Sequence, residues 1–502
     1  MESIGQINES LASLLASDPA LHALFVAHFE VAVREGELAL PPALEEKVGG
    51  WFSLPSDDDP QKASVERACR QRVICIRNRH TSDATHFNPL RALRPSGTSG
   101  AALDQEDKHV DQLVAGNEGA KCDFCAPVEK CALDTWGRVE GSHWISGANV
   151  AKFEGHHGVL LLKRHHPLAW EGEGIADLLS TWAAWAARTH EVHPDATHPL
   201  LLWNCLPRAG SSQLHGHAQC TLSPGGHVGM VRTLAEAAGR YLHAPPPGTD
   251  LDYLGDLVRA HAALGLARDM GGGVWVIAYL CARKEKELWV VGPPGGAPSD
   301  LAHGLWVALK ALRGEMGVRC FNVVAIGPPV AGPPPLGFAR CMARVIDRGS
   351  ARSGVSDMAA AEMFAVSVVA ADPVHVIAAV DRAAAAAGPP PAAARLPPAP
   401  AMGSACLARG PSAWVARWAG MVQGGQRAQA PWQIPPLSDL PGGPIPVLKE
   451  AAGQVLDVAC GSGRHLKLFL SLGFHVTGVD KDAAAARALQ GVGGGGGGQL
   501  EV

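Results

Sequence analysis

The chain has 502 residues, a length that suggests roughly two to four domains. Hydrophobic residues make up 47% and charged residues 18% of it, and the formal charge of -5 gives no electrostatic reason to expect nucleic acid as a partner. No apolar run approaches the ~20 residues that span a bilayer, and the opening MESIGQINES lacks the basic flank and apolar run of a secretory signal. The composition predicts a soluble, cytoplasmic protein without a membrane partner.

The N-terminal segment, residues 1–69, is predicted to be helical, because Leu, Ala, Val and Phe recur with acidic residues at helical spacing over residues 7–35. An apolar run at Val73–Ile76 then predicts a short strand. Residues 95–120 are rich in Gly, Ser and charge, and this composition predicts a poorly ordered excursion.

Cys122 and Cys125 form a CxxC pair, which presents two thiolates to one metal ion and needs two more ligands to complete a tetrahedron. Since no export signal is present, the 12 cysteines favour reduced thiols and a metal site over a disulfide framework. The alternative is that the pair consists only of small buried residues. Cys131 is a rival ligand.

The next segments alternate between strand and helix patterns. The run at 159–163, VLLLK, predicts a buried strand, and His156 and His157 before it are assigned to a turn because glycines flank them. Apolar residues from Ile175 to Ala186 recur at helical spacing, so this segment is an amphipathic helix whose tryptophans belong to the core.

The most informative stretch runs from Asn204 to Gln219, NCLPRAGSSQLHGHAQ. In a strand, residues at i, i+2 and i+4 point to one face, so His215, His217 and Gln219 can converge on one substrate. A neutral imidazole is a nucleophile at phosphorus, and small residues upstream let backbone N–H groups approach a phosphate. Taken alone, two such histidines are as often a surface pair or a structural metal site.

With its Asn, Gly and Ser at matching spacing, this stretch resembles the branched histidine-triad (HIT-like) superfamily. Within it, the resemblance is to the galactose-1-phosphate uridylyltransferase type, which includes nucleotide-sugar phosphorylases and dinucleoside-polyphosphate phosphorylases. The resemblance implies an α+β fold with duplicated HIT-like antiparallel sheets and helices. Residues 70–230 would form the first half and residues 231–382 the second.

The resemblance also implies roles for individual residues. His217 would be the nucleophile and Gln219 its phosphate partner, and the substrate-binding residues would be Asn204, Gly210, Ser212 and Gln213. A Zn²⁺ ion would be held by Cys122, Cys125, His215 and one of two adjacent histidines, His165 or His166, with His165 the expected ligand.

The reaction implied is nucleotidyl transfer through a covalent nucleotidyl-histidine. The donor would be a nucleotide sugar or a dinucleoside polyphosphate, and the acceptor phosphate or a sugar phosphate; a homodimer is a further expectation. The Ser-Gln before the first histidine resembles the dinucleoside-polyphosphate branch more than the hexose branch.

In the second half, residues 231–269 are predicted to be helical apart from a break at 245–248. Strands are expected at 274–280, 286–291 and 321–327, and a helix at 300–316. Residues 338–348 and 363–369 supply further strand or helix. The succession of strands around one long helix repeats the first half.

Residues 383–410 are rich in Ala and Pro and predict a linker. Beyond them, a strand at 455–459, a glycine turn, a helix and a strand at 474–479 follow the order of a nucleotide-binding half-fold. The form LDVACGSG resembles class I S-adenosylmethionine methyltransferases, which implies cofactor binding by Asp457, Gly461, Gly463 and Asp480. A doubly wound sheet needs more strands than follow Asp480, so residues 411–502 are expected to be a truncated Rossmann-like α/β fragment.

Two rival functions remain at this point. One is S-adenosylmethionine-dependent methyl transfer by the C-terminal fragment. The other is a non-catalytic, zinc-stabilised nucleotide-binding protein.

Overall fold

The computed structural model describes residues 1–388, except 55, 94–99, 228, 244, 247–251, 336, 355–357 and 359, and three strands between residues 454 and 501. The chain divides into two compact units, Met1–Ala394 and Arg395–Val502. Among the described helices, none has the length and apolar character needed to cross a bilayer.

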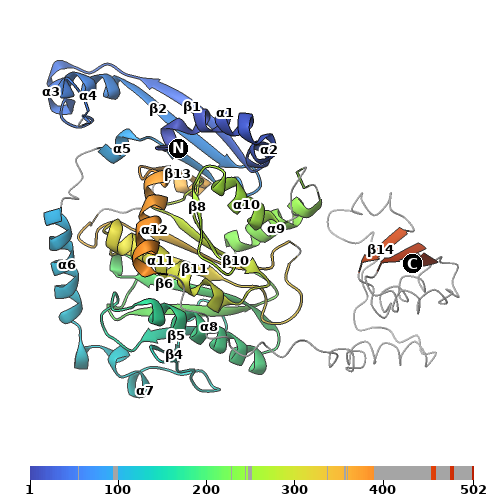
Figure 1. Ribbon diagram of the computed structural model, residues 1–502. Coiled ribbons are helices and arrows are strands. Elements are labelled where there is room, and N and C mark those ends of the chain that lie inside the picture. The colour runs from blue at the N-terminus through green and yellow to red at the C-terminus, as the bar shows by residue number, and fades with distance from the viewer. Residues whose placement is uncertain are drawn as a thin grey trace. The chain divides into compact units, whose positions relative to one another are not determined.

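The N-terminal part of the first unit combines helices with a small sheet. Its elements are α1 (Ile7–Ser17), α2 (Pro19–His28), β1 (Phe29–Glu37), α3 (Pro42–Val48), α4 (Pro60–Cys69), β2 (Arg70–Asn78), β3 (Ala84–Phe87), α5 (Leu90–Leu93) and α6 (Gly100–Ala115). A four-stranded sheet has the order β1-β2-β3-β13, in which β13 (Val366–Val369) pairs parallel to β3. In Figure 1 the outer ends of β1 and β2, with α3 and α4, extend away from the rest of this unit.

Two predictions for this part were wrong. Residues 7–35 were predicted to be helical, but α2 ends at His28. Phe29–Glu37 is a strand, because it pairs along its whole length with β2. Residues 100–115 form helix α6 instead of a disordered excursion. Val110 and Val114 of this helix are buried, and Asp107 accepts from Arg319 Nη2 at 2.9 Å, so tertiary contacts compensate for the polar composition.

The centre of the first unit is a nine-stranded sheet with the order β4-β5-β7-β6-β11-β12-β10-β9-β8. Its strands are β4 (Trp144–Ala148), β5 (His157–Leu162), β6 (Ala196–Cys205), β7 (His217–Pro224), β8 (Ala267–Asp269), β9 (Trp275–Ala278), β10 (Leu288–Pro294), β11 (Phe321–Ile326) and β12 (Arg340–Asp347). The other described α-helices are α7 (Pro127–Lys130), α8 (Gly172–Val192), α9 (Gly229–His243), α10 (Tyr253–Ala262), α11 (Ala302–Lys310) and α12 (Pro373–Ala387).

The order of these elements repeats. The first half runs β4, β5, α8, β6, β7 and the second runs β9, β10, α11, β11, β12, and within the sheet the strands take the orders β4-β5-β7-β6 and β9-β10-β12-β11. The predicted duplicated α+β fold is therefore present. The two sets of strands join through the antiparallel pair β6–β11 into one continuous sheet.

One row of paired residues crosses six strands of this sheet. Its members are Val159, Gln219, Leu202, Val324, Arg344 and Trp289, in that order from β5 to β10. From one end the row crosses β5, β7 and β6, and from the other end it crosses their counterparts β10, β12 and β11 in the same order. It therefore defines a pseudo-twofold axis between Leu202 and Val324, under which Gln219 corresponds to Arg344.

Helices cover one face of the sheet. Helix α8 packs on the strands of the first half, and α11 and α12 pack on those of the second (Figure 1). Trp182 and Trp185 of α8 are completely buried, as predicted for core residues. Because side chains alternate along a strand, the row from Val159 to Trp289 points to the other face.

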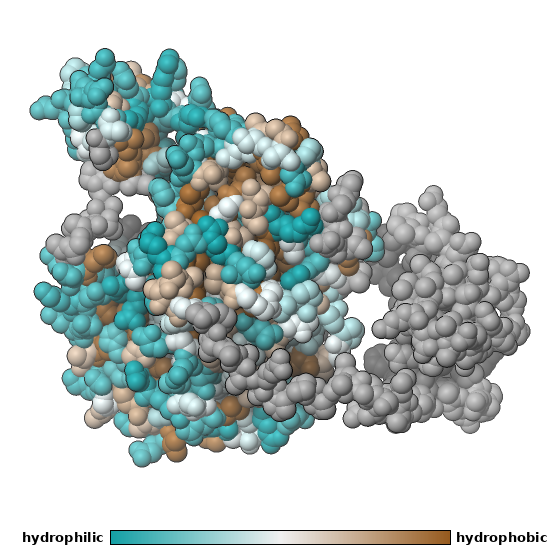
Figure 2. Space-filling view, in the orientation of Figure 1, coloured by the Kyte–Doolittle hydropathy of each residue, from teal (hydrophilic) through white to brown (hydrophobic). Residues whose placement is uncertain are grey.

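The surface seen in Figure 2 mixes hydrophilic and hydrophobic residues over the described part of the chain. Large exposed hydrophobic side chains occur in many separate elements, as expected for a globular protein.

Of the second unit, three strands are described: β14 (Gln454–Val458), β15 (His475–Val479) and β16 (Leu500–Glu501). β14 and β15 pair parallel, as expected for two strands joined by a crossover. Asp457 lies in β14, whereas Gly461, Gly463 and Asp480 lie outside the described residues. The linker was predicted to begin at residue 383, but helix α12 continues to Ala387, and residues from 389 to the end of the predicted linker lie outside the described part.

A buried imidazole on α10, that of His261, is expected to make the stability depend on pH. His261 Nδ1–H donates to Leu257 O at 2.7 Å, and its Nε2 accepts from Leu280 N–H at 3.1 Å. Burial lowers the pKa of His261 from 6.5 to about 4, with the charge of His28 adding to the effect. The unfolded state therefore takes up a proton first as the pH falls.

We expect the free energy of unfolding to be highest above pH 6.5 and to fall as the pH decreases towards about 4, because protonated His261 cannot accept from Leu280. In His261→Gln the amide oxygen can still accept that N–H and does not titrate, so its decline should be shallower. Thermal unfolding across this pH range measures both slopes, and equal slopes would contradict the assignment.

Candidate active site and metal centre

Four metal-ligating side chains converge at the end of the sheet near β5 and β7. One ligand atom each from Cys122, Cys125, His165 and His215 lies within 4.8 Å of the others. The two cysteines come from short helical turns before β4, His165 follows β5, and His215 precedes β7. Two thiolates and two imidazoles are a donor set that structural metal sites use.

The hydrogen bonds of the two imidazoles fix their tautomers. His215 Nε2–H donates to Leu162 O at 2.6 Å, and His165 Nε2–H donates to Val114 O at 3.1 Å. Both Nδ1 atoms therefore carry lone pairs, and they face each other at 3.1 Å. Two facing lone pairs repel unless a cation lies between them, so this geometry fits a bound metal ion.

The two rival ligands lie elsewhere. His166 Nε2 contacts Asp111 Oδ1 at 3.2 Å, and Cys131 Sγ contacts Asp123 O at 3.5 Å. Of the two adjacent histidines left open by the sequence, His165 is the one that the fold brings to the cluster.

His217 lies at the first position of β7 and is only 6% exposed. Its Nδ1–H donates to His215 O at 2.8 Å, which leaves the lone pair on Nε2. Burial lowers the pKa of His217, although this hydrogen bond opposes the shift, so the ring is neutral at neutral pH. The ring of Phe124 lies 5.3 Å from it.

The sequence suggested that the three side chains of the motif share one strand, but the structure places only two of them on β7. His215 precedes β7, and its ring turns into the metal cluster. His217 and Gln219 do lie on β7, at alternate positions of the same face.

Gln219 is held by His157, a residue that the sequence assigned to a turn. This assignment was wrong, because His157 is completely buried and begins β5. Its Nδ1 accepts from Phe153 N–H at 3.4 Å, and its Nε2–H donates to Gln219 Oε1 at 2.9 Å. Asn149 Nδ2 also approaches this oxygen, at 3.4 Å. The amide oxygen of Gln219 is thus occupied, and its NH₂ group is the one that can donate to a ligand.

The loop before β5 carries exposed apolar side chains, and one of them, Phe153, lies next to this pair. Phe153 is 65% and Val150 is 88% exposed, and the Phe153 ring lies 4.2 Å from that of His157. Such a platform beside a donor amide suits a planar group such as a base.

Asn204 lies on β6, near the end of the strand adjacent to β7. Its Oδ1 accepts from Asn322 Nδ2 at 2.7 Å, and the same Nδ2 donates to Ala209 O at 2.8 Å. This leaves Asn204 with its own NH₂ group as a donor. Asn322, on β11, was not singled out from the sequence, because a lone Asn in an apolar strand gives no signal.

The loop between β6 and β7 is shaped by glycine. Gly210 has a φ of 94°, a left-handed conformation that favours glycine. Ser212 and Gln213 follow it, and both side chains are exposed on the loop. Ser212 and Gln213 therefore lie on the loop surface, whereas Gln219 and Asn204 lie on strands of the sheet.

The cluster generates a testable expectation. Protein purified under reducing conditions should contain about one metal ion per chain, and Cys122→Ser should lose it and unfold at lower temperature, since a structural metal contributes folding free energy directly. Cys131→Ser, a matched change outside the cluster, should keep both. Elemental analysis and thermal unfolding measure this; metal-free wild-type protein, or full metal content in Cys122→Ser, would argue against the site.

No protein-family profile and no curated protein matches the chain. Solved structures similar to it include an ADP-glucose phosphorylase from Arabidopsis thaliana with bound ADP-glucose, at 15% identity over 61% of this chain and 97% of that one, with a TM-score of 0.46.

A galT-like protein from the same plant gives 16% identity, coverage of 52% and 92%, and a TM-score of 0.42. A uridylyltransferase is 16% identical over 50% of this chain and 88% of that one, with a TM-score of 0.41. These are proteins of the kinds that the segment Asn204–Gln219 resembles, but at such values the likeness transfers no activity.

Proposed function

We propose that the chain is a nucleotidyltransferase in which His217 carries the nucleotidyl group covalently. The observation that carries the proposal is the state of His217: its Nδ1–H donates to His215 O at 2.8 Å, so the lone pair lies on Nε2, and Gln219 lies on the same strand face. The donor is a nucleotide sugar or a dinucleoside polyphosphate, and the acceptor is phosphate or a sugar phosphate.

In the first step, His217 Nε2 attacks the α-phosphorus of the donor. The N–P bond forms as the P–O bond to the leaving group breaks, and the leaving group takes that electron pair. The ring becomes positively charged, and His215 O, which accepts from Nδ1–H, stabilises this charge. The Gln219 NH₂ group donates to a phosphoryl oxygen, because His157 holds its amide oxygen on the other side.

In the second step, an oxygen of the acceptor attacks the same phosphorus. The N–P bond breaks, its electron pair returns to Nε2, and the free enzyme is restored. Asn204, Gly210, Ser212 and Gln213 are the proposed groups around the phosphate, two of them through exposed loop positions.

We assign the four-ligand cluster to Zn²⁺, since this donor set is one that zinc prefers. The ion would bind Cys122, Cys125, His165 and His215 and hold the loop before β7 in place. Because His215 O accepts from the nucleophile, fixing His215 also fixes the orientation of His217.

Replacing His217 by Gly tests the central claim. The variant should form no covalent nucleotide adduct and lose turnover but keep the fold and nucleotide affinity, because nucleophile and binding groups are separate residues. Mass spectrometry of intact protein incubated with labelled donors measures the adduct, which should be acid-labile and base-stable as expected of a phosphoramidate.

The wild-type reaction should show ping-pong kinetics, because the leaving group departs before the acceptor attacks. A His217→Gly protein that still traps nucleotide, or initial-rate plots that intersect as for a ternary complex, would refute the mechanism. His166→Gly, next to the cluster but outside it, is the control and should still form the adduct.

The pair of His157 and Gln219 gives a second expectation. Gln219→Ala should slow both half-reactions, by about 10²–10³-fold if the amide is a fully engaged donor in the transition state. His157→Phe supplies another planar ring but loses both ring nitrogens, including the N–H that orients the amide, so it should lower kcat more than it raises KM.

Because His157 is proposed to act through Gln219, adding His157→Phe to Gln219→Ala should have little further effect on kcat. A double variant whose loss equals the product of the two single losses would show that His157 acts by another route.

A further inference from the structure

The second half of the sheet contains a cavity at the place that corresponds to the proposed active site. Its volume is about 340 Å³, and its floor includes Val324, Arg344 and Trp289, the second-half members of the row that crosses the sheet. Under the pseudo-twofold axis, Arg344 corresponds to Gln219 and Trp289 to Val159.

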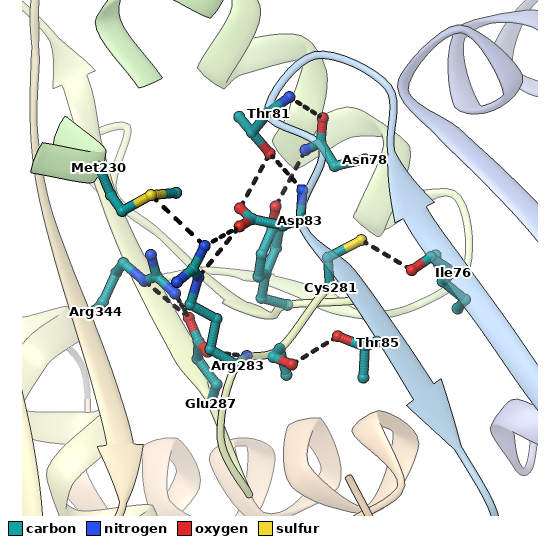
Figure 3. Close-up of polar contacts among 12 residues, drawn as sticks. Ile76, Asn78, Thr81, Asp83, Thr85, Met230, Cys281, Arg283, Glu287 and Arg344 are labelled. Atoms are coloured by element: carbon teal, nitrogen blue, oxygen red, sulfur yellow. Dashed lines mark hydrogen bonds and ion pairs between the residues drawn. The ribbon is translucent and has the colours of Figure 1, made fainter. Parts of the chain in front are cut away.

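The local hydrogen bonds repeat as well as the strands. In the first half, Phe153 N–H donates to His157, which in turn binds Gln219. In the second half, Arg283 N–H donates to Glu287 Oε2 at 2.6 Å, and Arg344 Nε donates to Glu287 Oε1 at 2.8 Å. The cavity is therefore the internal duplicate of the proposed active site. Figure 3 shows the contacts of Arg283, Glu287 and Arg344.

The duplicate lacks the nucleophile. His217 lies two residues before Gln219, and the residue two before Arg344 is Met342, which also lines the cavity. A thioether has no basic nitrogen to form a phosphoramidate. This half can therefore bind a ligand but cannot take over its nucleotidyl group.

The charges of the cavity are internally balanced. Arg344 pairs with Glu287 at 2.6 Å, Arg283 with Asp83 at 2.6 Å, and Lys284 with Glu362 at 2.8 Å. Figure 3 shows Arg283 between Asp83 and Glu287, beside Met230.

The rest of the wall is largely apolar, with Trp289, Ile326 and Met342 among its residues. A neutral, planar group fits such a wall better than the dianion of a sugar phosphate or a hydroxyl-rich sugar.

The cavity and His217 share one open sheet face. Gln219 and Arg344 are separated by three strand spacings, about 14 Å. Leu202 and Val324 lie between them and are only half-buried, so the floor between the two sites is partly accessible. A polyphosphate chain can cross this distance, whereas the pyrophosphate of a nucleotide sugar keeps the sugar close to the attacked phosphorus.

We propose that this cavity binds the second, non-transferred nucleoside of a dinucleoside polyphosphate. The inference rests on the proposed function and selects between its two donor classes. The ligand is itself twofold symmetric, with a nucleoside at each end, and the duplicated fold offers a nucleoside site at each end of the row. One end carries the nucleophile and the other only binds.

Binding stoichiometry in the full-length His217→Gly chain tests this without chemistry. Isothermal titration should find two molecules of AMP per chain but a single molecule of diadenosine tetraphosphate. The same titrations with UMP and diuridine tetraphosphate test whether the two sites prefer uridine to adenosine. A single mononucleotide site for both bases would overturn the proposal, and this readout is independent of whether His217 becomes nucleotidylated.

A pocket-blocking variant locates the second site. Met230 lies on α9 at the cavity wall and is 40% exposed, so Met230→Trp can fill the cavity with little disturbance of the core. In the His217→Gly background, Met230→Trp should reduce the number of bound AMP molecules to one per chain. It should also weaken the binding of diadenosine tetraphosphate at least about tenfold, the loss expected when a base loses its stacking contacts.

Binding of ADP-glucose should stay within twofold in the same variant. Val26→Trp, at an equally exposed position (40%) on α2 that does not line the cavity, is the matched control and should change neither ligand. Equal weakening of dinucleotide and nucleotide sugar, or two AMP sites surviving Met230→Trp, would overturn the assignment.

Discussion

The antiparallel pairing of β6 with β11 is the constraint on which the rest of the described structure depends. It joins two copies of the same strand and helix order into one sheet, with Leu202 opposite Val324 at the centre. Because side chains alternate along a strand, the register of this pair decides which residues of both halves share a face. A shift of one residue would place Asn204 and Asn322 on opposite faces of the sheet and separate the proposed active site from its duplicate.

The two faces of the nine-stranded sheet differ because helices cover one face and leave the other partly accessible. The face under α8, α11 and α12 is filled by buried side chains such as Trp203 and Val345, and its contribution is to stability. The opposite face keeps half-buried positions in β7, β6, β11 and β12, and several polar groups on it have side-chain partners. Gln219 is held by His157, Arg344 by Glu287 and Asn204 by Asn322. Each of these pairs fixes the orientation of one polar group on this face.

The candidate metal cluster and the proposed nucleophile, His217, are coupled through one residue. His215 directs its Nδ1 into the cluster and its carbonyl oxygen towards His217 Nδ1–H. The side chain of His215 thus belongs to the four-residue cluster, while its backbone oxygen orients the His217 ring. Position 215 therefore has two requirements, and a substitution there would disturb both at once.

The sequence by itself determined the motif, the CxxC pair, the amphipathic helix α8 and the succession of strands, because these depend on local periodicity and on short spacings. It left open the choice between His165 and His166, it placed His157 in a turn, and it missed Asn322. It also assigned helix to Phe29–Glu37 and disorder to α6. All five depended on partners more than 15 residues away or on cross-strand register, such as the nine-residue pairing of β1 with β2 or the contact of α6 with Arg319.

Only the tertiary structure could decide these points, since local propensity is weak beside the packing and hydrogen bonds that a distant segment supplies. The same holds for the duplicate site. Arg344, Glu287 and Met342 form no recognisable sequence motif, and their relation to Gln219, His157 and His217 exists only through the strand register that brings the two halves together.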